Sequence, residues 1–117
     1  MTKIERPTPN SARAFRTYPV DPERLLAAVR RAVEELPRWR LGGLAGNEVR
    51  AVRTTRLFRF RDDVTARVTP APHGARLELT SASRVGKGDL GQNPRNIEEL
   101  VRAVDREVGA PGESVRG

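Results

Sequence analysis

The chain has 117 residues and a formal net charge of +7, and it contains one histidine and no cysteine. This length predicts one domain that buries roughly two-thirds of its unfolded surface, which is enough for a single core. Without cysteine there are no disulfides, thiolate metal sites or thiol chemistry, and a lone histidine disfavours zinc and histidine-based catalysis. We therefore expect no metal and no cofactor.

No apolar run in the sequence approaches the ~20 residues that span a bilayer, and no signal-peptide core follows Met1. We expect a soluble, cytoplasmic protein without a membrane span. The positive charge is almost entirely arginine, because Lys3 and Lys87 are the only lysines. Guanidinium groups bind phosphate and carboxylate through paired hydrogen bonds, so this surface favours anionic partners. The alternative explanation of the positive charge is that the chain uses arginine in place of lysine and that these side chains simply face water.

The first part of the chain predicts an arm followed by a helix. Residues 1–20 show no periodicity and carry prolines, so we expect an extended arm. Asp21-Pro22-Glu23 is typical of a helix start, with a capping carboxylate followed by proline in the first turn. Apolar residues then recur at helical spacing until Pro37, at Leu25, Val29, Val33 and Leu36.

Four strands are expected in the middle of the chain. The first two cover residues 38–41 and 48–57 and are joined by a glycine-rich turn. Residues 58–63 are expected to bend the chain, and alternating apolar residues then predict strands at 64–68 and 77–81 around a loop at 69–74. Short connections favour an antiparallel meander with one face toward water.

The last part of the chain predicts a second helix and a tail. Asn93-Pro94 repeats the cap-and-proline pattern, and a helical stripe of apolar residues runs from Ile97 to Val108. Residues 109–117 predict a flexible tail. The expected fold is α+β: within residues 21–108, a four-stranded antiparallel meander has one helix before it and one after it, both packed on one face.

Several short segments resemble a known family. Thr55-Arg-Leu-Phe-Arg-Phe-Arg-Asp-Asp-Val64 matches Thr-x-x-x-x-Phe-x-Asp-Asp-Val, Ser81-Ala-Ser-Arg-Val-Gly86 matches Ser-x-Ser-Arg-x-Gly, and Asp89-Leu-Gly-Gln-Asn93 matches Asp-Leu-Gly-x-Asn. With Pro9-Asn10, these motifs resemble the bacterial and plastid domain-of-unknown-function family 1499. The resemblance implies a shared fold unit and a signature region, and it implies no activity. Ser11 stands where the family typically has cysteine, so no thiol-dependent activity is carried over.

The connection between the last strand and the second helix is the leading candidate site. Arg84 and Arg95 are placed to clamp an anion, and backbone amides near Gly86 and Gly88 would add positive potential. The alternative is that these residues only stabilise the connection, with Asn93 capping the helix and Asp89 pairing with Arg84. The candidate ligand-binding residues are Ser81, Ser83, Arg84, Asp89, Asn93 and Arg95.

A second candidate is a nucleic-acid surface, because aromatic residues alternate with arginines as they do on single-strand binding platforms. Its residues are Arg56, Phe58, Arg59, Phe60 and Arg61. The neighbouring Asp62 and Asp63 point to opposite faces of an extended strand and therefore do not form a catalytic pair. Asp63 is instead a candidate partner for an arginine of the signature region.

The leading interpretation is a small, non-catalytic binding module for an anionic small molecule or an acidic protein surface. Nucleic-acid binding through residues 50–61 is the first alternative. An enzyme that uses Asp63 or Asp89 as general base is the second, although the sequence places no obvious partner group beside either carboxylate.

Overall fold

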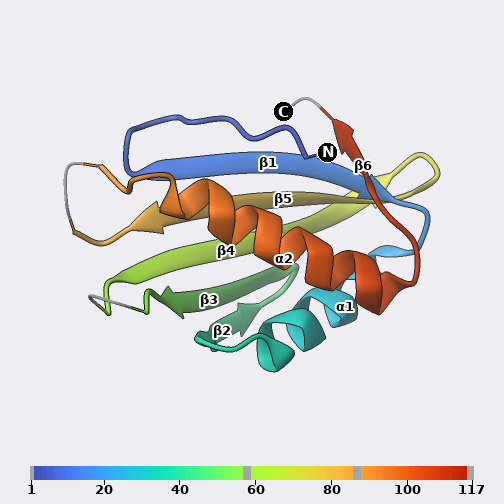
Figure 1. The fold of residues 1–117 in the computed structure, drawn as a ribbon. Coiled ribbons are helices and arrows are strands. Elements are labelled where there is room, and N and C mark those ends of the chain that lie inside the picture. The colour runs from blue at the N-terminus through green and yellow to red at the C-terminus, as the bar shows by residue number, and fades with distance from the viewer. Residues whose placement is uncertain (1, 57–58, 86–87, 116–117) are drawn as a thin grey trace.

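The computed structural model describes residues 2–56, 59–85 and 88–115. It contains one antiparallel sheet and two helices (Figure 1). In chain order the elements are β1 (Ser11–Tyr18), α1 (Pro22–Glu35), β2 (Trp39–Ala45), β3 (Glu48–Thr54), β4 (Arg61–Ala71), β5 (Gly74–Ser83), α2 (Gln92–Val108) and β6 (Glu113–Val115). The strand order across the sheet is β2-β3-β4-β5-β1-β6.

The α+β class and the antiparallel pairing agree with the sequence prediction, but the sheet has six strands rather than four. Both terminal segments join it. β1, expected as part of an arm, pairs with β5 from Ser11 opposite Ala82 to Tyr18 opposite Ala75. β6, expected as part of a flexible tail, pairs with the outer side of β1.

The boundaries of the middle strands also differ from the prediction. β3 ends at Thr54, and Leu57, the expected last residue of this strand, lies outside the described residues. β4 already begins at Arg61 and continues to Ala71, so the expected bend at 58–63 and loop at 69–74 are both too long. The sheet register extends β4 because Asp62 and Asp63 pair with residues of β5 on one side and β3 on the other.

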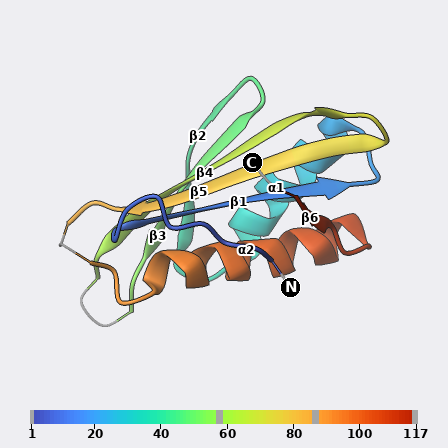
Figure 2. The same cartoon turned by 90° about the horizontal axis from the view of Figure 1, so that it is seen from above.

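Both helices cover the same face of the sheet, as predicted, and they also pack against each other (Figure 1). Figure 2 shows α2 running along one side of the sheet. The core lies between these layers and includes Leu25, Val29, Val33, Val49, Val64, Leu77, Leu79, Ile97, Leu100 and Val104. Among the described residues, neither helix is long and apolar enough to cross a membrane.

One end of the molecule gathers several loops. The β3–β4 connection, the β5–α2 connection and the turn that leads into β1 lie at this end in Figures 1 and 2. The candidate sites predicted from the sequence fall on these loops and on the strand ends that carry them.

Candidate functional site

A buried polar cluster holds the first turns of α2 on the sheet. Asn96 Nδ2 donates hydrogen bonds to Asp62 Oδ2 at 2.8 Å and to Ser81 Oγ at 3.1 Å. Ser81 Oγ in turn donates to Asn93 Oδ1 at 2.6 Å. All four residues are buried, so these mutual bonds offset the cost of removing their polar groups from water. Ser81 and Asn93, predicted as ligand contacts, therefore present no surface to a ligand.

The N-cap residue of α2 is Gly91, so the prediction that Asn93 caps this helix is wrong, and Asp89 supplies the side-chain acceptor at the helix start. Asp89 Oδ2 accepts from the backbone N–H of Asn93 at 3.1 Å, and Oδ1 accepts from that of Gly91 at 2.8 Å. Arg6 Nη2 donates to Oδ1 at 2.7 Å. Burial alone would raise the pKa of Asp89, but the hydrogen bonds from Arg6, Gly91 and Asn93 outweigh it and hold the pKa below its usual value.

Arg84 does not pair with Asp89, contrary to the structural alternative drawn from the sequence. It pairs with Asp63, with Nη2 2.8 Å from Oδ1 and Nε 3.0 Å from Oδ2. This confirms the expected pairing of Asp63 with an arginine of the signature region. Asp62 is buried and Asp63 is exposed, so the two carboxylates do lie on opposite faces of β4.

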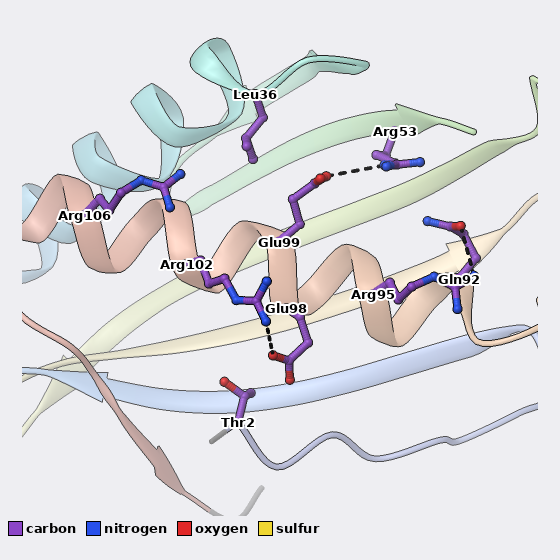
Figure 3. Close-up of a pocket in the computed structure, with 9 residues that line it drawn as sticks. All are labelled: Thr2, Leu36, Arg53, Gln92, Arg95, Glu98, Glu99, Arg102 and Arg106. Atoms are coloured by element: carbon purple, nitrogen blue, oxygen red, sulfur yellow. Dashed lines mark hydrogen bonds and ion pairs between the residues drawn. The ribbon is translucent and has the colours of Figure 1, made fainter. Parts of the chain in front are cut away.

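The side chain of Arg95 is exposed on α2. It lines a groove of 790 Å³ along this helix (Figure 3). Much of the charge in the groove is already neutralised. Arg102 pairs with Glu98 at 3.9 Å, and Arg53 pairs with Glu99 at 3.4 Å. A groove with this balance of charge attracts anions only weakly.

A stronger concentration of charge lies where β2 and β4 begin and β3 ends. There a hollow of 480 Å³ is lined by Trp39, Thr54 and four arginines. We call it the arginine hollow, and its arginines are Arg38, Arg40, Arg59 and Arg61. No acidic side chain of the described residues lines it, and none of its arginines forms an ion pair within the described ranges.

The sequence around Trp39 explains two of these arginines. Trp39 is buried, and its Nε1 donates a hydrogen bond to Glu99 of α2. Neighbouring residues of an extended strand point to opposite faces, so fixing the indole in the core directs Arg40 to the open side. Arg38, just before β2, lies on the other flank of Trp39 and also lines the hollow. Neither arginine was predicted from the sequence as a site residue, although this alternation could have placed the two together.

Strand pairing explains the positions of Thr54 and Arg61 in the arginine hollow. Thr54 is paired with Arg61 across β3 and β4, and its backbone N–H donates to the carbonyl of Arg38 at 2.9 Å. On the other side, the backbone N–H of Arg84 donates to the carbonyl of Arg61 at 3.1 Å. The signature arginine Arg84 therefore lies just after β5, bonded to the β4 residue that lines the arginine hollow.

The backbone at this end of the molecule is strained. Within the described ranges, three residues other than glycine have positive φ angles, and they are Arg38 at 67°, Arg59 at 55° and Leu90 at 52°. The left-handed conformation costs such a residue roughly 1–2 kcal/mol. Strain of this kind is concentrated at functional sites, where the rest of the fold holds it in place. Two of the three strained residues line the arginine hollow.

The nucleic-acid candidates are only partly brought together. Arg59 and Arg61 line the hollow, Arg56 is exposed, and Phe60 is 48% exposed. Phe58 lies outside the described residues, as does Gly86 of the signature region.

Neither suggested general base is available as a free carboxylate, because Asp63 pairs with Arg84 and Asp89 pairs with Arg6. A general base works best with a pKa near the operating pH, whereas the pKa of Asp89 is lowered. Within residues 2–56, 59–85 and 88–115, no group of three or more His, Asp or Glu side chains is placed to hold a metal ion.

Residues 3–104 match the family described as "Protein of unknown function (DUF1499)". The chain belongs to this family. The match covers most of the chain, from the segment that contains Arg6 to the last turns of α2. Three segments carry the resemblance to DUF1499 in the sequence, residues 55–64, 81–86 and 89–93, and their described residues contribute to the loop-bearing end.

Three solved structures are similar to the DUF1499 chain at low sequence identity, and one of them has a TM-score above 0.5. A protein of Rhodobacter sphaeroides is 15% identical, with a TM-score of 0.52 over 93% of this chain and 99% of that one. TTHA0849 from Thermus thermophilus is 18% identical, with a TM-score of 0.48 over 84% and 96% of the two chains. CV1439 from Chromobacterium violaceum is 16% identical, with a TM-score of 0.47 over 85% and 94%. None of the curated proteins matches the chain in sequence.

Proposed function

We propose that this DUF1499 protein is a binding module that holds an anionic group, such as a phosphate, in the arginine hollow. The observation that carries the proposal is the set of four arginines around one hollow without an acidic partner among the described residues. Like charges held close together repel one another, and a bound anion removes that repulsion. Each guanidinium can also donate paired N–H bonds to phosphate or carboxylate oxygens.

The proposed partner is of the class expected from the sequence, an anionic group, but the residues proposed to bind it are different. Within the connection of residues 81–95, the polar groups of Ser81, Asp89 and Asn93 are occupied by the fold. Arg84 lies beside the hollow but is paired with Asp63. The four arginines of the hollow form no ion pair among the described residues, so their combined charge is available to a ligand.

Trp39 offers a direct test, because it is the only tryptophan of the chain and it lines the hollow. Titration with pyrophosphate at low ionic strength is expected to change the tryptophan fluorescence in a saturable way. The double variant Arg59→Gln/Arg61→Gln should weaken this binding by at least tenfold, since hydrogen bonds between charged groups contribute roughly 1.5–3 kcal/mol each.

The matched control is Arg31→Gln/Arg95→Gln, which removes the same charge from two exposed arginines outside the hollow. It should bind pyrophosphate almost as well as the wild type. An equal loss in both double variants would mean that only net charge matters, and the arginine hollow would not be the site.

A further inference from the structure

Large apolar side chains are exposed on loops at the same end of the molecule as the arginine hollow. Phe60 is 48% exposed just before β4, and Val85 and Leu90 are 57% and 94% exposed in the β5–α2 connection. Figures 1 and 2 both place these two connections at the same end of the molecule. Among the described residues, one other large apolar side chain is comparably exposed, Leu44, which lies 54% exposed near the opposite end of β2.

The two connections are held next to each other. The backbone bond from Arg84 to Arg61, at 3.1 Å, joins the end of β5 to the start of β4. The Arg84–Asp63 ion pair joins the same two strands through their side chains. Phe60 is also fixed, because its carbonyl accepts from the N–H of Thr55 at 2.7 Å and its own N–H donates to Thr55 Oγ1 at 2.8 Å.

Leu90 is held outward by its neighbours. The carboxylate of Asp89 is only 2% exposed and binds the backbone N–H groups of Gly91 and Asn93. These bonds fix the residues on both sides of Leu90, which adopts a φ of 52° and projects into solvent. A strained backbone that exposes a leucine is unfavourable in water, so the arrangement points to a partner that receives this side chain.

Arginines and apolar side chains at one end suit the boundary of a lipid bilayer. Apolar groups there enter the region between headgroups and acyl chains, while cations meet the anionic phosphates. A single strand of nucleic acid would also attract the arginines, but its bases bind by stacking on aromatic rings. Phe60 offers one ring, but Val85 and Leu90 are aliphatic and offer none, so two of the three exposed side chains favour lipid over nucleic acid.

We infer that this end of the molecule binds an anionic membrane surface, with lipid headgroup phosphates at the arginine hollow and Phe60, Val85 and Leu90 inserted beside it. The inference rests on the proposed function, because the lipid phosphate is the anion that the hollow holds. It adds the source of that phosphate and a second set of contacting residues. The protein attaches to the surface by this end.

Sedimentation with vesicles tests the inference. The wild type should bind vesicles of phosphatidylcholine mixed with phosphatidylserine, should bind pure phosphatidylcholine vesicles far less, and should lose binding as salt is added. Val85→Ser/Leu90→Ser should weaken vesicle binding by roughly tenfold or more, since each apolar side chain loses its burial. Leu44→Ser is the matched control, with a comparably exposed side chain at a distance, and should bind as the wild type does.

The pyrophosphate titration separates this inference from the proposed function. Val85→Ser/Leu90→Ser should still bind pyrophosphate, which shows in the same experiment that the variant is folded. If the wild type binds pyrophosphate but no vesicles, the membrane inference is overturned and the proposed function stands. If it binds neither, both are overturned.

Two further results would overturn the membrane inference alone. One is unchanged vesicle binding by Val85→Ser/Leu90→Ser, because insertion of these side chains is then unnecessary. The other is tighter binding of a single-stranded oligothymidylate than of vesicles, with the same affinity in the wild type and in that variant. This second result would assign the arginines to nucleic acid.

Discussion

The guanidinium of Arg6 and the carboxylate of Asp89 lie 2.7 Å apart, although the two residues are separated by 83 positions in the sequence. Arg6 also donates to the backbone carbonyls of Pro9 at 2.8 Å and Ser11 at 2.9 Å. A single side chain thereby fastens the segment before β1 to the start of α2. The same carboxylate accepts hydrogen bonds at the helix start, so the N-terminal segment and the helix start should be lost together.

Asp89→Ala is expected to lower the free energy of unfolding by about 2 kcal/mol, because it removes the side-chain acceptor at the helix start and leaves the buried amide of Asn93 with one acceptor fewer. Urea unfolding measures this loss. Asp63→Ala is the matched control, since Asp63 also pairs with an arginine but is exposed, and exposed ion pairs contribute about 0–1 kcal/mol. Equal losses in the two variants would contradict the role given to Asp89.

The lowered pKa of Asp89 predicts how stability depends on pH. Because the folded pKa lies below the ordinary value of 3.8, the contribution of Asp89 is fully present above that value. It is lost as the pH falls from 3.8 through the folded pKa. The difference in urea midpoint between the wild type and Asp89→Asn should therefore be constant at neutral pH and shrink in this acidic range. If this difference in urea midpoint persists unchanged to low pH, the contribution of Asp89 comes from packing and not from its charge.

The helices could be predicted from the sequence because their apolar stripes, such as Leu25 with Val29 and Val33, are local patterns. β1 could not, because its inward side chains include two alanines and an arginine, which carry little apolar signal. Arg16 is buried and donates to the carbonyl of Gly112 at 2.6 Å, a bond that ties the C-terminal segment to the sheet.

The signature region could be located from its sequence, but its contacts could not. Which carboxylate meets Arg84 depends on the register of β4 and β5, where Asp63 lies opposite Ala82. The partner of Asp89 comes from a segment without periodicity. The arginine hollow depends on three strand ends that meet only in the folded sheet, so no single stretch of sequence displays it.

A pair of acidic residues on the two helices gives a pH dependence of stability opposite to that of Asp89. The carboxyl groups of Glu35 and Glu107 share a hydrogen bond between α1 and α2, and this bond raises the pKa of Glu35 above its ordinary value of 4.5. A raised carboxyl pKa means that the stabilising proton is bound below 4.5 and is lost as the pH rises through the folded pKa. Above the folded pKa both carboxyl groups are charged and repel each other. Glu107→Gln removes this repulsion.

The melting temperature of this variant should be higher than that of the wild type at pH 7. At pH 4 the increase should be smaller, or the variant should melt at a lower temperature than the wild type. The effect should be small and should fade with added salt, because Glu35 is exposed to solvent and Glu107 is only half-buried. A gain that is the same at both pH values would show that the two carboxyl groups do not interact.

The buried bond from Asn96 to Asp62 provides the last prediction. Asn96→Ala removes the amide that donates to Asp62 Oδ2, and the carboxylate is then buried without that donor. We expect a loss of about 2–3 kcal/mol in the free energy of unfolding, since a buried polar group that loses its partner bears the full cost of leaving water. Adding Asp62→Leu to this variant removes the stranded carboxylate and should recover much of the loss. If the double variant is less stable than Asn96→Ala, Asp62 is stabilised by groups other than Asn96, and the cluster would not be what holds α2 on the sheet.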